Sequence, residues 1–422
     1  MVNQLVRAIA AGLADDRVER HKADRPLATT DEEKALAQEI ARRFLAGGGP
    51  SSEWGTSLTS VEDEAVVSEA INRVLGLGRL EELLHNEEIS DIHVRGNAPV
   101  WLKMRSGERR EHEPIVESDD ELVDLIRRIA SRMGHREQRF DPSHPELNLQ
   151  LRDGSRVFAT MEVSARPSLI IRRHRFEYSH LPELVSLGMM NEDVAAFLSA
   201  AVRSRKNIVV SGGTGSGKTT LLRALINEVP QLERIVTIED AFEIGIDRFH
   251  EAHPDHDALQ ARLANTEGSG AVTMSDLARM ALRMDPDRVV VGEVRGAEAF
   301  PMLLAMSQGN NGSMCTMHAD SARNVFPKLL AYVAMAQVGI PTEAVNLLIS
   351  TSVHFVVQLQ TIENVRRVVS IHEIVQSDGY GVSSNEVFSC SSGGPGFAAL
   401  RAVTQQDLEK HGFSMRGDFA WA

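Results

Sequence analysis

The run Ser211-Gly-Gly-Thr-Gly-Ser-Gly-Lys-Thr-Thr220 directly follows the apolar stretch Asn207-Ile-Val-Val210. Its spacing, G-x-x-x-x-G-K-[ST], is that of a Walker A phosphate loop. The apolar stretch predicts a strand that enters the loop, and residues 219–229 have the spacing of a helix that ends before Pro230. This order favours phosphate binding, because backbone N–H groups at a helix N-terminus close around phosphate oxygens. The sequence therefore predicts a nucleoside triphosphate site in an α/β fold.

Within this loop, the expected roles follow from side-chain chemistry. Lys218 is expected to reach the β- and γ-phosphates of ATP, and the Thr219 hydroxyl to ligate Mg²⁺. The other nucleotide contacts are expected from the rest of the loop: Gly212, Gly213, Thr214, Gly215, Ser216, Gly217 and Thr220. A flexible Gly/Ser turn that merely contains a lysine is the alternative, and the flanking strand and helix patterns argue against it.

The bulk composition narrows the class of protein. The 422 residues are enough for two or three domains, with 42% hydrophobic and 25% charged residues. A net charge of −14 argues against broad electrostatic capture of nucleic acid. No apolar run approaches the ~18 residues of a membrane span, the N-terminal residues lack a secretory signal pattern, and two cysteines are too few for a disulfide framework. We therefore expect a cytoplasmic protein.

The pattern along the chain predicts four stretches. Residues 1–85 are charged and mostly helical in pattern, and residues 86–185 mix strands and helices as in a small α+β domain. Apolar strands alternate with helices over residues 186–375, which predicts a parallel sheet flanked by helices. Residues 376–422 form a Ser/Gly-rich tail, expected to be largely unstructured apart from a short helix near residues 404–411.

A carboxylate follows another predicted buried strand of the α/β region. Glu293 comes directly after Val289-Val-Val-Gly292, at the strand end where open α/β sheets bind their ligands. This is the Walker B position, from which a carboxylate can orient the attacking water or hold it through the Mg²⁺ shell. Gly292 stands where many such strands carry a metal-binding aspartate, so help with the metal is expected from elsewhere.

Two further candidate groups follow predicted strands. Glu239 and Asp240 end an apolar stretch, so one of these neighbours is expected to face the metal; a solvated acidic turn is the alternative. His318 follows a short strand through Met317 and is either a structural histidine or a sensor of the γ-phosphate.

Four segments follow one another along the chain in the order of four motifs of one family. They are the Walker A loop, Glu239-Asp240, Gly292-Glu-Val-Arg-Gly296 and His318-Ala-Asp-Ser321. They resemble the Walker A, Asp box, Walker B and His box of the type II/type IV secretion-system ATPase superfamily. Within it, the chain most resembles the CpaF-like branch of tight-adherence (Tad/Flp) pilus assembly, over roughly residues 85–375.

This resemblance implies a homo-hexameric ring in which nucleotide lies between a small N-terminal domain and a RecA-like domain. It also implies a motor at the cytoplasmic face of the membrane that acts on a polytopic inner-membrane platform protein. Arg172 and Arg173 of the N-terminal domain are then candidate arginine fingers; a solvated basic strand edge is the alternative. One departure is Gly309-Asn-Asn-Gly-Ser313, where the family commonly has Gly-His-Asp/Glu-Gly-Ser.

Two other function classes remain. A conjugation-type or RecA-like DNA motor would share the fold but should carry basic, aromatic-interleaved loops, whereas this chain is acidic with 5% aromatic residues. A nucleotide-binding scaffold without activity is the other, and the intact Lys218, Thr219 and Glu293 argue against it. The pattern does not distinguish pilus extension, retraction and secretion.

Overall fold

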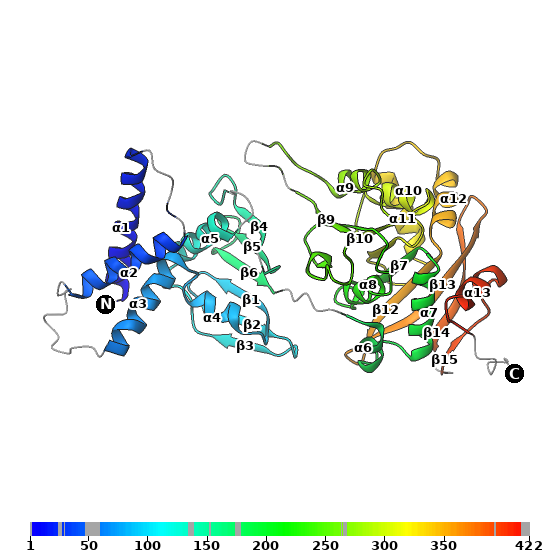
Figure 1. Ribbon diagram of the computed structural model, residues 1–422, viewed down its shortest axis with the longest axis horizontal. Coiled ribbons are helices and arrows are strands. Elements are labelled where there is room, and N and C mark those ends of the chain that lie inside the picture. Colours follow the sequence, from blue (N-terminus) through cyan, green and yellow to red (C-terminus); the bar gives the residue numbers. More distant parts are fainter. Residues whose placement is uncertain are drawn as a thin grey trace. The chain divides into compact units, whose positions relative to one another are not determined.

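The computed structural model describes residues 2–23, 28, 30–46, 60–133, 139–151, 153–173, 179–262, 264, 268–391 and 394–414. The chain divides into two compact units, residues 1–175 (unit 1) and 176–422 (unit 2) (Figure 1). This division lies ten residues before the predicted boundary at 185. The reason is helix α6 (Leu181–Ser186), whose Leu181 and Leu184 are buried in the core of unit 2.

Three helices form the first part of unit 1. Helices α1 (Val2–Lys22), α2 (Thr30–Ala46) and α3 (Ser60–Leu75) contact one another pairwise. Their shared core consists of small and aliphatic side chains: Leu5, Ile9, Leu13, Ala37, Ala41, Ala70 and Ile71. This arrangement confirms the predicted N-terminal helical region.

The rest of unit 1 is a six-stranded antiparallel sheet in the order β3-β2-β1-β6-β5-β4. The strands are β1 (Ile89–Arg95), β2 (Val100–Met104), β3 (Arg109–His112), β4 (Glu146–Gln150), β5 (Arg156–Thr160) and β6 (Ser168–Arg172). Helices α4 (Arg79–His85) and α5 (Asp119–Met133) share one core with one face of this sheet. The α+β prediction is confirmed, although the polar strand β3 (Arg109–His112) lacks an apolar pattern that would predict it.

Unit 2 contains a nine-stranded sheet in the order β15-β14-β13-β12-β7-β11-β10-β8-β9. The six strands from β12 to β9 in this order run parallel: β7 (Ile208–Gly212), β8 (Ile235–Glu239), β9 (His256–Gln260), β10 (Arg288–Val294), β11 (Met314–Met317) and β12 (Phe355–Ile362). Because β7, β11, β10 and β8 are consecutive neighbours, their carboxyl ends meet at one edge.

Helices cover both faces of this sheet. Residues of α7 (Glu192–Arg203) and α8 (Lys218–Ile226) share one core with Ile208 and Val210, and Val209 lies in the other core. The second core contains residues of α9 (Met274–Ala281), α10 (Ala299–Ser307), α11 (Val325–Met335) and α12 (Thr342–Ser352). Successive side chains of a strand point to opposite faces, so both faces of β7 are buried. The predicted RecA-like α/β architecture is confirmed.

The expectation of a largely unstructured stretch after residue 375 is wrong for the described residues. Strand β13 (Val365–Ser377) pairs antiparallel with β12 and with β14 (Val382–Ser391), and β14 pairs with β15 (Gly394–Phe397). Helix α13 (Ala402–Glu409) matches the short helix that the sequence predicts. The rings of Phe397 and Phe413 lie 5.2 and 5.3 Å from that of Phe197, so this segment completes a core of unit 2.

None of the helices in the described part of the chain combines the length and the apolar character that crossing a bilayer requires.

Candidate active site

The glycine-rich loop joins the buried strand β7 to helix α8, as the sequence predicts. Gly217 precedes the helix with φ 94°, a left-handed conformation that favours glycine. A Cβ on Gly212 would lie 2.6 Å from the carbonyl oxygen of Leu359, so only glycine fits there. Gly213, Thr214 and Gly215 are exposed at the tip of the loop. The loop therefore presents an accessible backbone to a phosphate.

Lys218 curls back over this loop. Its Nζ donates to the carbonyl oxygens of Gly212 at 3.1 Å and Gly213 at 2.8 Å, and lies 3.2 Å from Nδ1 of His318. Partial burial lowers the pKa of Lys218, which the nearby Glu293 opposes. The ammonium group is thus positioned by acceptors of the loop itself, at the place where the phosphates of a nucleotide would bind.

His318 connects the lysine to the predicted catalytic carboxylate. Its Nε2 lies 2.8 Å from Oε1 of Glu293, and its Nδ1 faces Lys218. Burial, and then the Lys218 ammonium, lower the pKa of His318, so the neutral ring is favoured near pH 7. If Lys218 donates to Nδ1, the neutral ring carries its proton on Nε2, the nitrogen that lies 2.8 Å from Oε1 of Glu293.

Glu293 is paired with a guanidinium on its other side. Nη2 of Arg295 lies 2.6 Å from Oε2 of Glu293, and its Nη1 lies 3.6 Å from Asp240. Partial burial alone would raise the pKa of Glu293, but the hydrogen bond from Arg295 holds it below its usual value. Glu293 is therefore an ionised carboxylate at neutral pH. Asp240 lies at the end of this series of contacts, and 66% of its side chain is exposed.

Glu239 lies in the interior of unit 2, at the end of β8. It is buried, and its Oε2 accepts hydrogen bonds from the backbone N–H groups of Glu243 at 2.7 Å and Ile244 at 2.8 Å. Burial raises the pKa of Glu239 to about 7. These contacts fix the turn that follows β8.

That turn places a carboxylate beside the Walker A threonine. Oγ1 of Thr219 donates to Oε2 of Glu243 at 3.2 Å. The sequence analysis did not select Glu243 as a candidate metal ligand. Glu243 lies only four residues after Glu239, whose carboxylate accepts the hydrogen bonds of this turn. Glycine at position 292 also has an explanation here, because a Cβ on Gly292 would lie 3.1 Å from Cγ of Glu239.

The structure places the predicted arginines in unit 1. Nε of Arg172 donates to Oδ1 of Asp91 at 3.0 Å, and Arg173 donates to the carbonyl oxygen of Asn86. Burial alone would raise the pKa of Asp91, whereas hydrogen bonds from Arg172 and Ser90 hold it below its usual value. Contact of these arginines with a nucleotide stays a prediction.

In the described part of the chain, no three His, Cys, Asp or Glu side chains are grouped so that they could hold a metal ion. A divalent ion at the Walker A loop would therefore need ligands beyond the protein side chains, as Mg²⁺ does when it binds with phosphates and water.

The edge of the unit 2 sheet thus has the geometry of a P-loop ATPase. Residues 62–399 match the family described as Type II/IV secretion system protein. A Mycobacterium tuberculosis protein named "Putative conjugal transfer protein" is 37% identical over 269 residues, which cover 62% of this chain and 74% of that protein. The type IV secretion system protein VirB11 of Brucella suis is 30% identical over 327 residues, which cover 71% of this chain and 88% of VirB11.

Among solved structures, the Legionella pneumophila ATPase DotB has a TM-score of 0.50 at 20% identity, covering 71% of this chain and 80% of DotB; this likeness concerns the fold. The match over residues 62–399 covers most of the chain. The chain belongs to the type II/IV secretion system ATPase family, whose members include secretion and conjugation motors.

Proposed function

We propose that this chain hydrolyses ATP with Mg²⁺ to drive Tad/Flp-type pilus assembly, as a CpaF-like motor at the cytoplasmic face of the membrane. The sequence motifs that resemble this branch support the choice of pilus assembly. The observation that carries the ATPase part is the contact series Lys218–His318–Glu293–Arg295 at the edge of the parallel sheet.

In the proposed reaction, each of these groups has one task. Lys218, held over the loop by two carbonyl oxygens, contacts the β- and γ-phosphates and offsets their charge. Glu293, ionised because Arg295 lowers its pKa, accepts a hydrogen bond from the attacking water and aligns it with the γ-phosphorus. His318 contacts both Lys218 and Glu293. It therefore couples the residue that binds the phosphates to the residue that aligns the attacking water.

The residues around Thr219 fit a Mg²⁺ ion. The Thr219 hydroxyl and the Glu243 carboxylate lie in contact, and both are oxygen donors of the kind that Mg²⁺ prefers. We propose Thr219 and Glu243 as protein groups at this ion, with Asp240, Glu293 and Glu239 as the alternative carboxylates. The ion would supply positive charge that neutralises the phosphate oxygens.

We further propose that the working form is a homo-hexamer in which Arg172 or Arg173 reaches the phosphates of a bound nucleotide. A head-to-tail contact that closes produces a ring. A guanidinium also contacts two phosphate oxygens at once, which a lysine ammonium does not do with fixed geometry. Arg172→Lys or Arg173→Lys should then slow turnover by about tenfold, whereas Arg203→Lys and Arg205→Lys should not; equal activity of all four would contradict this contact.

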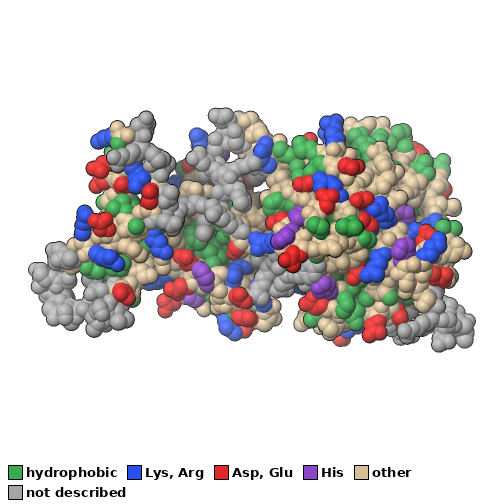
Figure 2. All heavy atoms as spheres, viewed as in Figure 1, with side chains coloured by type: hydrophobic (Ala, Val, Ile, Leu, Met, Phe, Trp, Pro, Cys, Tyr) green, Lys and Arg blue, Asp and Glu red, His purple; other side chains and the backbone are tan. Residues whose placement is uncertain are grey.

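The second candidate is a motor for DNA transfer. It is favoured by the 37% identity to the mycobacterial protein named for conjugal transfer. Against it, the net charge is −14, and on the face shown in Figure 2 the Lys and Arg side chains are interspersed with Asp and Glu. A broad basic surface, which binding along a nucleic acid backbone needs, is not visible on that face.

The experiment replaces the wild-type gene in the source cell with one that encodes Lys218→Ala. Surface pili are counted by electron microscopy, and the frequency of DNA transfer is measured in parallel. Loss of pili with unchanged transfer is the expected result. Unchanged pili with abolished transfer would contradict pilus assembly and support the second candidate.

A further inference from the structure

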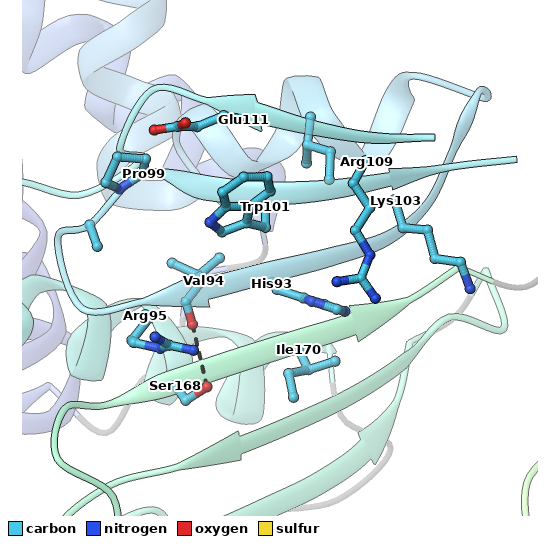
Figure 3. Close-up of a pocket in the computed structure, with 12 residues that line it drawn as sticks. His93, Val94, Arg95, Pro99, Trp101, Lys103, Arg109, Glu111, Ser168 and Ile170 are labelled. Atoms are coloured by element: carbon cyan, nitrogen blue, oxygen red, sulfur yellow. Dashed lines mark hydrogen bonds between the residues drawn. The ribbon is translucent and has the colours of Figure 1, made fainter. Parts of the chain in front are cut away.

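A cavity of about 510 Å³ opens on the exposed face of the unit 1 sheet (Figure 3). Every residue that lines it comes from unit 1, from β1, β2, β3, β6 and the turn between β1 and β2. The Walker A loop, by contrast, belongs to unit 2. No residue of the Walker A loop lines this cavity.

The floor of the cavity is a row of flat and apolar side chains. Trp101, His93 and Ile170 stand opposite one another in register on β2, β1 and β6. Trp101 is 50% exposed and Ile170 is 38% exposed, and both side chains line the cavity. An indole ring with an accessible face is a stacking surface for another aromatic ring.

Positive charge lies on both sides of this row, along the strands. Figure 3 shows Arg95 on one side of Trp101, and Arg109 and Lys103 on the other. Nζ of Lys103 is 3.9 Å from the buried Asp91. Among the described residues, no carboxylate lies within 4 Å of the guanidinium groups of Arg95 or Arg109, and Glu111 is the one carboxylate that lines the cavity.

These charges contrast with the rest of the protein. The chain has a net charge of −14, yet three cations and one carboxylate line this cavity. Arg95 and Arg109, which have no carboxylate within 4 Å among the described residues, lie beside an exposed tryptophan and fit a ligand that is both aromatic and anionic. The volume is that of a small-molecule site, which commonly measures about 300–1,000 Å³.

We propose that this cavity is a second nucleotide site, which binds a nucleotide independently of the Walker A loop. The base stacks on Trp101 and contacts His93 and Ile170. The phosphates bind Lys103 and Arg109, which lie on the same exposed face about 7 Å along the strands from Trp101. Binding here adds a regulatory ligand to the motor and requires no hydrolysis.

The test uses the full chain with Trp101 as its one tryptophan. The sequence has three tryptophans, so Trp54→Phe and Trp421→Phe leave Trp101 alone. Adding Lys218→Ala impairs the Walker A site. Titration with ADP should then quench the Trp101 fluorescence and saturate, whereas ribose 5-phosphate, which has no base, should not.

Two charge reversals on β3 distinguish a specific phosphate contact from a general electrostatic effect on ADP binding. Arg109→Glu should weaken ADP binding by about tenfold, since it reverses one phosphate contact. Arg110→Glu is the control, because Arg110 does not line the cavity and pairs with Glu108 at 2.8 Å. It should change the affinity less than about twofold.

Several outcomes would overturn the second site. These are the absence of ADP quenching up to millimolar concentration, quenching by an oligothymidylate with no response to ADP, and equal loss of affinity in Arg109→Glu and Arg110→Glu. Trp101→Ala should also keep normal ATP hydrolysis; loss of hydrolysis in a folded Trp101→Ala protein would instead make the cavity part of the catalytic cleft. Failure of the ATPase proposal itself would appear as an inactive wild-type chain and would leave the quenching unchanged.

Discussion

The two sheets of this protein present their polar side chains in opposite ways. In unit 2, helices cover both faces of the sheet, so the reactive groups gather at the edge where parallel strands end. In unit 1, helices cover one face of an antiparallel sheet, and the other face remains exposed with Trp101 and Ile170 on it. The candidate catalytic groups Lys218, Glu293 and His318 therefore converge at one edge in unit 2, whereas the exposed side chains of unit 1 spread across one face of its sheet.

The two regions also differ in how their charges are paired. At the edge in unit 2, Lys218, His318, Glu293 and Arg295 contact one another in series. On the open face in unit 1, Arg95 and Arg109 have no carboxylate within 4 Å among the described residues. A series of paired groups keeps a fixed geometry, which catalysis needs, whereas cations without such partners are available to an incoming anion.

The largest effect is expected at the lysine of the paired edge. Lys218→Ala should reduce phosphate release by about 100- to 1,000-fold, because it removes the charge that contacts the transferred phosphoryl group. Lys206→Ala is a matched control, since Lys206 pairs with Asp407 at 2.8 Å and should keep normal turnover. Near-normal hydrolysis by Lys218→Ala would break the assignment of this edge as the catalytic region.

A second prediction concerns the buried carboxyl behind the edge. The pKa of Glu239 is about 7 in the folded chain, above its usual value of 4.5. The folded state therefore binds the extra proton, and this contribution is complete below about pH 4.5 and is lost as the pH rises through 7. The free energy of unfolding should fall by about 3 kcal/mol from this group between pH 4.5 and 8.

Glu239→Gln removes that titration. Urea unfolding of both proteins at pH 5, 6, 7 and 8 measures it, since the pH dependence of all other groups cancels in the difference. The wild type should lose stability relative to the variant as the pH rises. A constant difference across the four pH values would show that Glu239 does not titrate in this range.

The smallest effect is expected at the metal. Glu243→Gln should raise the Mg²⁺ concentration for half-maximal turnover by about tenfold, because its carboxylate contacts the Thr219 hydroxyl. Asp240→Asn is the control: its carboxylate is two-thirds exposed, and a change below about twofold is expected. A larger increase for Asp240→Asn than for Glu243→Gln would contradict the role of Glu243 and indicate that Asp240 binds the metal.

The fold of unit 2 follows from the sequence because its central strands are continuous apolar runs. Val289, Val290 and Val291 are buried, and such runs are typical of parallel strands covered on both faces. The segment Val382–Ser391 was missed because it is polar; it becomes a strand through pairing with the long β13. Tertiary contacts outweigh local propensity there.

The site was partly accessible to sequence reasoning. Lys218, Glu293 and His318 each follow a predicted strand, and neighbouring strand ends bring them together. Glu243 was not found, since its position depends on the hydrogen bonds that Glu239 accepts within the turn. The cavity in unit 1 also depends on register, because Ile170 comes from β6, far along the sequence from His93 on β1 and Trp101 on β2.

The central claim is that Glu293 acts on the water while Lys218 acts on the phosphates. The direct test is a single-turnover ATP hydrolysis assay of Glu293→Gln, with ATP affinity measured on the same sample. The account predicts hydrolysis slowed by about 100-fold or more, with ATP affinity unchanged within about threefold, because the side-chain shape is kept and the charge is lost. Hydrolysis at nearly the wild-type rate would contradict it.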